Sequence, residues 1–86
     1  MDIEYDGAKD ASNIAKHGLS LADAPMIDLL TAAVSVDDRG YGERRFRAFQ
    51  RIDGIGYCLA FTVRGSVVRP ISFRRAHDKE MKRHGE

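Results

Sequence analysis

Few residues of this chain can form covalent or metal cross-links. Its 86 residues include one cysteine, Cys58, and no tryptophan. A single cysteine excludes an internal disulfide, and no spacing of cysteine and histidine suggests a zinc site. We therefore expect a protein that needs no metal or cofactor and works in a reducing cytoplasm.

Long hydrophobic runs are also missing. The longest, YCLAFTV at 57–63, is far too short to span a bilayer. The first ten residues, MDIEYDGAKD, are acidic and lack the basic-then-apolar pattern of a secretion signal. With 43% hydrophobic and 31% charged residues the composition is that of a globular protein. These features predict one small cytoplasmic domain over residues 1–86, with no membrane contact.

Each half of the chain is short of one sign of charge, although the net charge is only +1. Residues 1–38 contain two lysines and eight acidic residues, a net charge of −6. Residues 39–86 contain twelve basic and five acidic residues, a net charge of +7. Such a division suggests a polyanionic partner for the basic half and a basic partner for the acidic half. The alternative is that the two halves face each other and cancel, and the counts favour neither.

The first third of the chain predicts a short strand over 2–5 and then two helices. The first helix runs from about Gly7 and ends at Gly18, a suitable C-terminal glycine. Its apolar face consists of Ala8, Ala11, Ile14 and Ala15. The second helix is expected to begin after a cap at Ser20 or Asp23 and to end near Thr31. Asp23 is preferred, because it places Pro25 in the first turn.

After residue 33 the hydrophobic period changes to two, which predicts an antiparallel meander. Its four strands lie at 33–36, 44–52, 57–63 and 67–74. The third is apolar on both faces and is therefore a central strand, while Pro70 requires an edge or a bulge in the fourth. A helix over 77–84 follows. The predicted class is α+β, in the order β-α-α-β-β-β-β-α.

One face of the strand at 44–52 combines cations with an aromatic ring. Arg45, Arg47, Phe49 and Arg51 alternate with Phe46, Ala48, Gln50 and Ile52. Arginines interleaved with a ring suit single-stranded nucleic acid, in which phosphates meet guanidinium groups and bases stack on aromatic rings. The alternative is the solvated side of a half-buried sheet, where arginine stems cover apolar surface.

A second basic cluster occupies the last two strands. Its members are Arg64, Arg69, Ser72, Arg74 and Arg75. Arginine binds a phosphate through two parallel hydrogen bonds and keeps its charge near neutral pH, so this cluster could hold a scissile phosphate. A basic cluster of this kind more often binds than cuts.

Two features of the N-terminal helices also bear on function. His17 is a candidate proton carrier, but its position at the end of a helix favours a structural role over that one. The pair of helices superficially resembles a helix-turn-helix. The second helix, however, carries Asp23 and Asp28 and no lysine or arginine, so a DNA groove would repel it.

Three motifs together resemble the BrnT family of toxins from type II toxin–antitoxin modules. The first is formed by Lys9, Asn13, Lys16, His17 and Gly18, the second by Gly42, Glu43 and Arg45, and the third by Arg64, Arg69, Ile71, Ser72, Arg74, Ala76 and Glu80. The resemblance extends from Tyr5 to about His84. The chain departs from the family pattern at four positions, Tyr5, Leu21, Gln50 and His84, where Trp, Phe, Gly and Tyr are common.

This resemblance implies a RelE-like fold and a metal-independent ribonuclease that halts translation. It also implies a partner, a BrnA-like antitoxin encoded by a neighbouring gene, which carries the DNA-binding element. Contact with DNA would then be indirect. The leading hypothesis is RNA cleavage by the 2′-OH of the substrate, which leaves a cyclic phosphate. The competing class is a non-catalytic module that binds RNA or the antitoxin.

The candidate site residues follow from these readings. We expect Arg64, Arg69 and Arg74 to clamp the phosphate, with Lys9 or His17 assisting proton transfer and Ser72 positioning the substrate. Glu43 is either a base or the ion-pair partner of an arginine. The expected RNA-binding residues are Arg45, Arg47, Phe49, Arg51 and Arg75.

Overall fold

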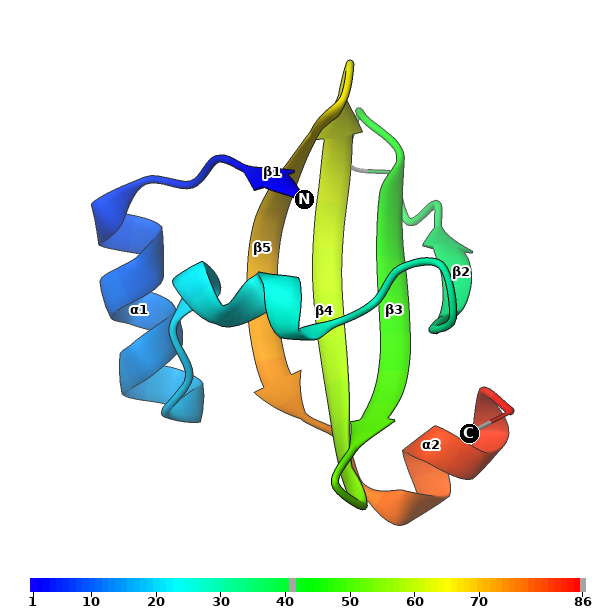
Figure 1. Cartoon of the computed structure of the whole chain (residues 1–86). Coiled ribbons are helices and arrows are strands. Elements are labelled where there is room, and N and C mark those ends of the chain that lie inside the picture. The colour runs from blue at the N-terminus through cyan, green and yellow to red at the C-terminus, as the bar shows by residue number, and fades with distance from the viewer. Residues whose placement is uncertain (41, 86) are drawn as a thin grey trace.

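A computed structural model describes residues 1–40 and 42–85 of the chain. Its elements, in order, are β1 (Asp2–Ile3), α1 (Gly7–His17), the 3₁₀ helix η1 (Leu21–Met26), β2 (Ala33–Asp37), β3 (Arg45–Ile52), β4 (Ile55–Arg64), β5 (Val67–Arg75) and α2 (Asp78–Arg83). The described strands form one sheet in the order β1-β5-β4-β3-β2 (Figure 1). Strands β2 to β5 are antiparallel and β1 is parallel to β5. The predicted α+β class and meander are confirmed, whereas the RelE-like topology stays a prediction.

Two-residue turns connect the three long strands. Asp53 and Gly54 join β3 to β4 with φ angles of 52° and 79°. Positive φ at both positions is the conformation that suits a tight hairpin, and Asp-Gly is a favoured pair for it. Gly65, with φ 60°, opens the turn between β4 and β5. Both turns lie where the sequence predicts them.

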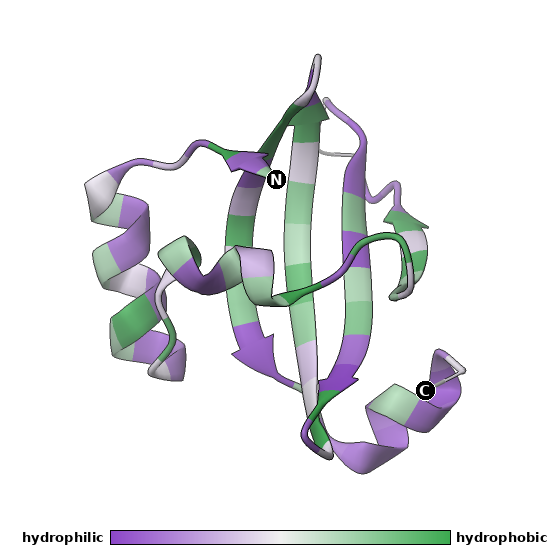
Figure 2. Cartoon of the chain, viewed as in Figure 1, coloured by the Kyte–Doolittle hydropathy of each residue, from purple (hydrophilic) through white to green (hydrophobic). Residues whose placement is uncertain are grey.

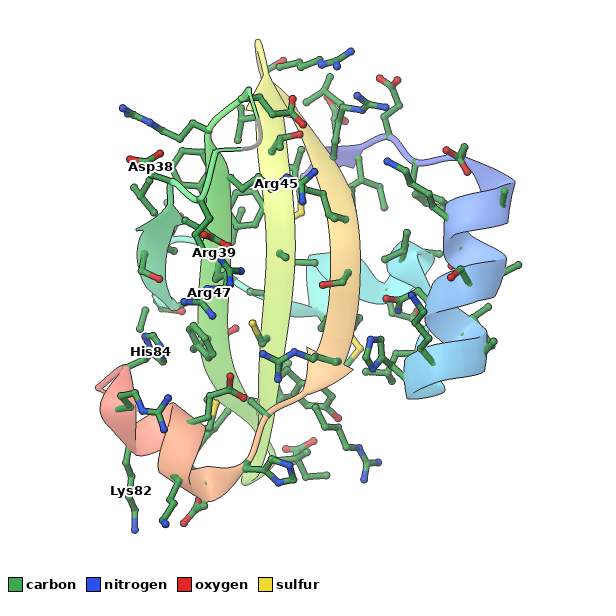
Figure 3. All side chains as sticks on the ribbon, turned by 180° about the vertical axis from the view of Figure 1, so that it is seen from behind. Asp38, Arg39, Arg45, Arg47, Lys82 and His84 are labelled. Atoms are coloured by element: carbon green, nitrogen blue, oxygen red, sulfur yellow. The ribbon has the colours of Figure 1, made fainter. Side chains whose placement is uncertain are left out.

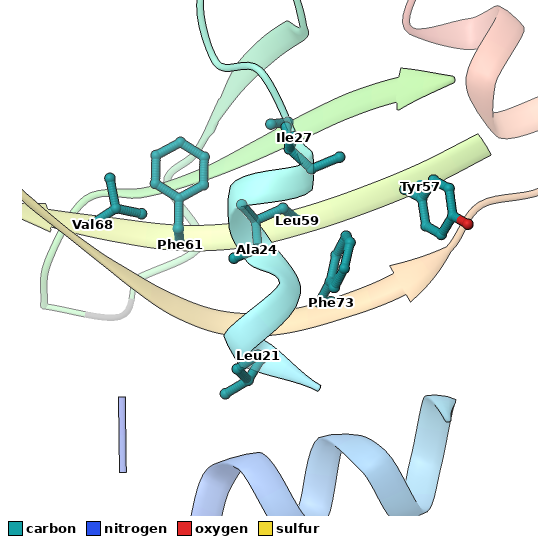
Figure 4. Close-up of a cluster of buried hydrophobic side chains, with 9 residues drawn as sticks. Leu21, Ala24, Ile27, Tyr57, Leu59, Phe61, Val68 and Phe73 are labelled. Atoms are coloured by element: carbon teal, nitrogen blue, oxygen red, sulfur yellow. The ribbon is translucent and has the colours of Figure 1, made fainter. Parts of the chain in front are cut away.

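The main core lies between η1 and one face of the sheet. Leu21, Ala24 and Ile27 are buried in one cluster with residues of the strands that η1 crosses (Figure 4). The strand residues of this cluster are Ala48, Tyr57, Leu59, Phe61, Val68 and Phe73. Figure 2 shows hydrophobic positions along the central strand β4 and a mostly hydrophilic α2. None of the helices in the described part of the chain has the length and apolar character that a bilayer crossing requires.

The predicted second helix is wrong in type and bounds. The Ser20 hydroxyl, not Asp23, caps η1 by accepting from the Ala22 N–H at 3.1 Å. The helix then ends at Met26, because Ile27 takes an extended conformation and points into the core with 1% exposure. Packing onto the sheet therefore overrides the helical continuation to Thr31 that the local sequence suggests.

Helix α1 ends at Gly18 as predicted, with φ 72° there, but its predicted apolar face is exposed. Its buried residue is Asn13. The Asn13 amide donates to the carbonyls of Leu19 (2.7 Å) and Phe73 (2.9 Å) and accepts from the Phe73 N–H (3.1 Å). Strand β1 pairs with β5 at Val67 and Val68. The backbone N–H and C=O groups on the outer edge of β5 beyond Val68 therefore need other hydrogen-bond partners. A polar contact, not apolar burial, therefore attaches α1 to the sheet.

Candidate active site

The sheet face turned away from η1 carries a basic depression. Across β4, Ala60 pairs with Arg47 of β3 and with Ser72 of β5, and Cys58 pairs with Arg74. Cross-strand partners point to the same face, so the small Ala60 and Cys58 form the floor between longer side chains. We call this space the arginine hollow. Its volume is about 210 Å³, and its lining includes Asp37, Arg39, Arg45, Arg47, Cys58, Ala60, Ile71, Ser72 and Arg74.

Two further spaces open beside the arginine hollow at a bulge in β5. Ala60 pairs with Ser72 but the next residue, Phe61, pairs with Pro70, so Ile71 is an extra residue in β5. This is the irregularity that Pro70 predicts. Ile71 borders the arginine hollow and both of the further spaces, which we call the helix groove and the mixed hollow. The helix groove (about 180 Å³) is lined by Lys9, Ser12, Asn13, Lys16, His17, Ile71 and Ser72. The mixed hollow (about 30 Å³) includes Glu4, Asp6, Lys9, Glu43, Arg45, Thr62, Arg69 and Ile71.

Arg74 is fixed within the arginine hollow by the C-terminal helix. Its two terminal nitrogens donate to the two carboxylate oxygens of Glu80 on α2, each at 2.8 Å. These hydrogen bonds are the main reason that the pKa of Glu80 lies below its usual value and the pKa of Arg74 above its usual value. A bidentate, charge-assisted pair restricts the guanidinium to one orientation.

Arg47 lies on the ring of Phe49, which is itself covered. The Arg47 guanidinium carbon is 5.7 Å from the Phe49 ring centroid, within the range of a cation–π contact. The His84 ring stacks on Phe49 at 3.8 Å, and Phe49 is fully buried with Cys58 and Met81 beneath α2. Phe49 therefore offers no open ring face for a base, contrary to its expected role, and instead orients Arg47.

The Arg47 side chain has unused hydrogen-bonding capacity. Its Nε is buried and has no hydrogen-bond partner among the described residues. Buried donors without a partner are uncommon in folded proteins and call for an explanation. An anion bound in the arginine hollow would supply the missing acceptor.

A second ion pair borders the arginine hollow opposite Arg74. The Arg39 Nε and Nη2 donate to the two carboxylate oxygens of Asp37 at 2.7 and 2.8 Å. The Arg39 hydrogen bond is the largest cause of a lowered pKa for Asp37. Figure 3 shows Arg39, Arg45 and Arg47 gathered on this face of the sheet. Sequence reasoning missed Arg39, which lies in a predicted loop outside the three motifs, and named Glu80 only as part of the third motif, without a role in the site.

The remaining predicted residues separate into two groups. Lys9, Glu43 and Arg69 meet in the mixed hollow, where the Arg69 Nε lies 3.9 Å from a Glu4 carboxylate oxygen. His17 lies in the helix groove, and Ser72 lies between that groove and the arginine hollow. In the mixed hollow acidic residues of the first half meet basic residues of the second, so the two halves partly cancel there.

Three predicted arginines lie outside these spaces. Arg64 is exposed at the end of β4 and lines none of the three. Arg51 donates to Asp78 on α2 at 2.6 Å. Arg75 pairs with Tyr57, whose ring belongs to the opposite face. Among the described residues, no group of three or more His, Cys, Asp or Glu side chains could hold a metal ion.

Comparison with known proteins identifies the family of the chain. A family model described as the ribonuclease toxin BrnT of type II toxin–antitoxin systems matches residues 5–80. The crystal structure of the Brucella abortus ribonuclease toxin BrnT is similar, with a TM-score of 0.71 and 34% identity over 91% of this chain and 99% of that chain. A search among curated proteins found no match. The chain therefore belongs to the BrnT family of ribonuclease toxins of type II toxin–antitoxin systems.

Proposed function

We propose that this protein cleaves RNA in the arginine hollow without a metal ion and thereby stops translation. The observation that carries the proposal is the pair Arg47 and Arg74, which face each other across the small floor residues Ala60 and Cys58. One guanidinium is fixed by Glu80, and the other keeps a buried Nε without a partner among the described residues. A phosphodiester group between them would complete this arrangement.

The proposed reaction is an internal transfer of the phosphoryl group. The ribose 2′-oxygen attacks the adjacent phosphorus and releases its proton to a base. The bond from phosphorus to the 5′-oxygen then breaks, and that oxygen takes up a proton. The products are a 2′,3′-cyclic phosphate and a 5′-hydroxyl. Arg47 and Arg74 stabilise the additional negative charge of the transition state, a contribution of about 3 kcal/mol for one well-placed donor.

The charges of the site narrow the choice of proton carrier. Asp37 and Glu80 are poor bases, since arginine hydrogen bonds lower the pKa of both carboxyl groups. The remaining candidates are Lys9 and His17 in the helix groove and Glu43 in the mixed hollow. Lys9 and His17 line the helix groove together with Ile71 and Ser72, whereas Glu43 shares only Ile71 with that groove. The Ser72 hydroxyl would position the ribose.

The test of the chemistry is an analysis of RNA fragments made by the purified chain in excess EDTA. We expect cleavage to continue in EDTA and the fragments to end in 2′,3′-cyclic phosphates. Fragments with 3′-hydroxyl ends, or activity lost in EDTA, would contradict the mechanism. Expression of the chain alone in bacteria should also stop growth and protein synthesis. Normal growth with abundant folded protein would favour the non-catalytic binding module instead.

A toxin of a type II toxin–antitoxin system has an antitoxin partner. We propose a BrnA-like antitoxin, encoded by a neighbouring gene, with an acidic or amphipathic segment that covers the arginine hollow. A stable complex of this kind buries roughly 800 Å² or more on each partner. RNA and antitoxin would then compete for Arg47 and Arg74, and any contact with DNA would go through the antitoxin.

A further inference from the structure

The helix groove is a cationic space in which the proposed reaction gives roles to Lys9, His17 and Ser72 but none to Ser12 or Lys16. Lys9, Ser12 and Lys16 are spaced along α1 so that they share one side of the helix, facing Ile71 and Ser72 of β5. None of the residues that line the groove is acidic. Neither Lys9 nor Lys16 forms an ion pair with another residue in the described part of the chain. Lys9 also borders the carboxylates of the mixed hollow, so Lys16 is the lysine of the groove that shares its space with no carboxylate.

Hydrogen bonds hold the groove open. Asn13 joins the middle of α1 to the backbone of Phe73 in β5. Three residues before Asn13, the Asp10 carboxylate accepts from the Leu21 N–H at 2.7 Å and from the Ser20 hydroxyl at 3.0 Å. These contacts fix both the distance and the rotation of α1 relative to the sheet. Because α1 cannot rotate away from the sheet, its lysines stay beside the groove.

The two spaces beside the arginine hollow differ in their charge. The mixed hollow contains three carboxylates, Glu4, Asp6 and Glu43, which offset its cations Lys9, Arg45 and Arg69. The helix groove contains two lysines and a histidine and no carboxylate. A polyanion that leaves the arginine hollow at Ile71 and Ser72 would be repelled by carboxylates on one path and attracted on the other.

We infer that the helix groove binds the RNA backbone phosphate adjacent to the one that is cleaved. Lys16 supplies the charge, and the Ser12 hydroxyl, one turn earlier on the same side of α1, donates a hydrogen bond. Ser72 marks the junction, because it borders both the groove and the arginine hollow. This inference rests on the proposed cleavage of RNA. It adds that the site is extended and that an RNA with two or more phosphodiesters is the better substrate.

The test uses uncleavable 2′-O-methyl RNA, a dinucleotide with one phosphodiester and a tetranucleotide with three. Binding to the wild type, Lys16→Gln and Lys79→Gln is measured by titration at several salt concentrations. Lys79 is the matched control, an exposed lysine of α2 that borders none of the three spaces. Thermal unfolding of each variant checks that its fold is intact.

We expect Lys16→Gln to weaken tetranucleotide binding by roughly fivefold. It should also reduce the slope of log K against log salt by about 0.7, the value for one lost single-strand phosphate contact. Dinucleotide binding should be unchanged, and Lys79→Gln should match the wild type throughout. If Lys16→Gln and Lys79→Gln bound the tetranucleotide with equal affinity, the proposed subsite would be wrong, whereas the proposed cleavage of RNA would still stand. If the wild type bound neither the dinucleotide nor the tetranucleotide and also cleaved no RNA, both proposals would be wrong.

Discussion

Glu80 binds both terminal nitrogens of Arg74, with each carboxylate oxygen 2.8 Å from its own nitrogen. The pair connects α2 to β5 at the border of the arginine hollow. The short C-terminal helix thereby determines where one of the two proposed phosphate-binding arginines points. Its neighbour Asp78 forms a similar pair with Arg51, but that pair lies outside the hollow.

Removing the charge of Glu80 should slow cleavage without unfolding the protein. Arg74 would lose its fixed orientation, and misplacement of a catalytic group by about 1 Å can reduce a rate by up to about a hundredfold. We expect Glu80→Gln to lower kcat roughly tenfold, within that limit. Asp78→Asn, the same change on the same helix, should leave kcat unaltered.

A double-mutant cycle distinguishes a positioning role from a general structural one. If Glu80 acts through Arg74, the variant that combines Glu80→Gln with Arg74→Ala should be no slower than Arg74→Ala alone. Additive losses in kcat would show that Glu80 acts independently of Arg74.

The same pair predicts how stability changes in acid. Because the pKa of Glu80 is lowered in the folded state from its usual value of 4.5, the pair stabilises the fold fully above that value. This contribution is lost as the pH falls below 4.5 through the folded-state pKa. The difference in unfolding free energy between wild type and Glu80→Gln, from urea denaturation, should be constant above about pH 5.5 and shrink in acid. A difference that grows as the pH falls would have the wrong sign.

Cys58 reports on the attachment of α2. It is 2% exposed beneath Met81, and burial raises the pKa of its thiol, so alkylation of the native protein should be slow. A Cβ added to Gly56 would lie 2.5 Å from the Met81 Cγ and 2.9 Å from the Ala76 carbonyl oxygen. Gly56→Ala should therefore displace α2 and accelerate labelling of Cys58. Gly7→Ala, where a Cβ meets nothing within 4 Å, is the control and should label at the wild-type rate.

The parts of the fold that the sequence predicts are those decided by neighbouring residues. The Asp53-Gly54 turn, the Gly18 helix end and the bulge beside Pro70 each follow from the conformational limits of one or two residues. The alternation along β3 also holds, since Ala48 joins the core while Arg47 lines the opposite face. Local chemistry is sufficient in all of these cases.

The errors concern contacts between distant segments. Asn13 is buried because an unpaired stretch of β5, sixty positions later, needs hydrogen-bond partners. Phe49 is covered because His84 stacks on it, and the identity of that covering residue depends on where α2 docks. Arg64 and Arg74 look equivalent in the sequence, but only Arg74 borders the hollow. Alternation along one strand cannot reveal which residues of other segments meet it.

Antitoxin binding should depend on the same arginines as cleavage. An acidic segment over the arginine hollow would associate quickly at low salt and more slowly as salt screens the charges. We expect Arg47→Ala to weaken the complex with the product of the neighbouring gene and to reduce its salt dependence, whereas Arg64→Ala leaves both unchanged. Surface plasmon resonance across a salt series measures this. Tight binding that ignores salt and Arg47→Ala would place the antitoxin on another face.

The most direct test of the account is the cleavage rate of one defined RNA by Arg74→Ala and Arg64→Ala, each compared with the wild type. Both changes remove one arginine from the last two long strands, but only Arg74 lines the arginine hollow. We predict that Arg74→Ala reduces the single-turnover rate by roughly a hundredfold or more, as loss of a transition-state donor does. Arg64→Ala should stay within about twofold of the wild type, because exposed substitutions outside a site change little. Full activity of Arg74→Ala, or a loss confined to Arg64→Ala, would contradict the placement of the active site in the arginine hollow.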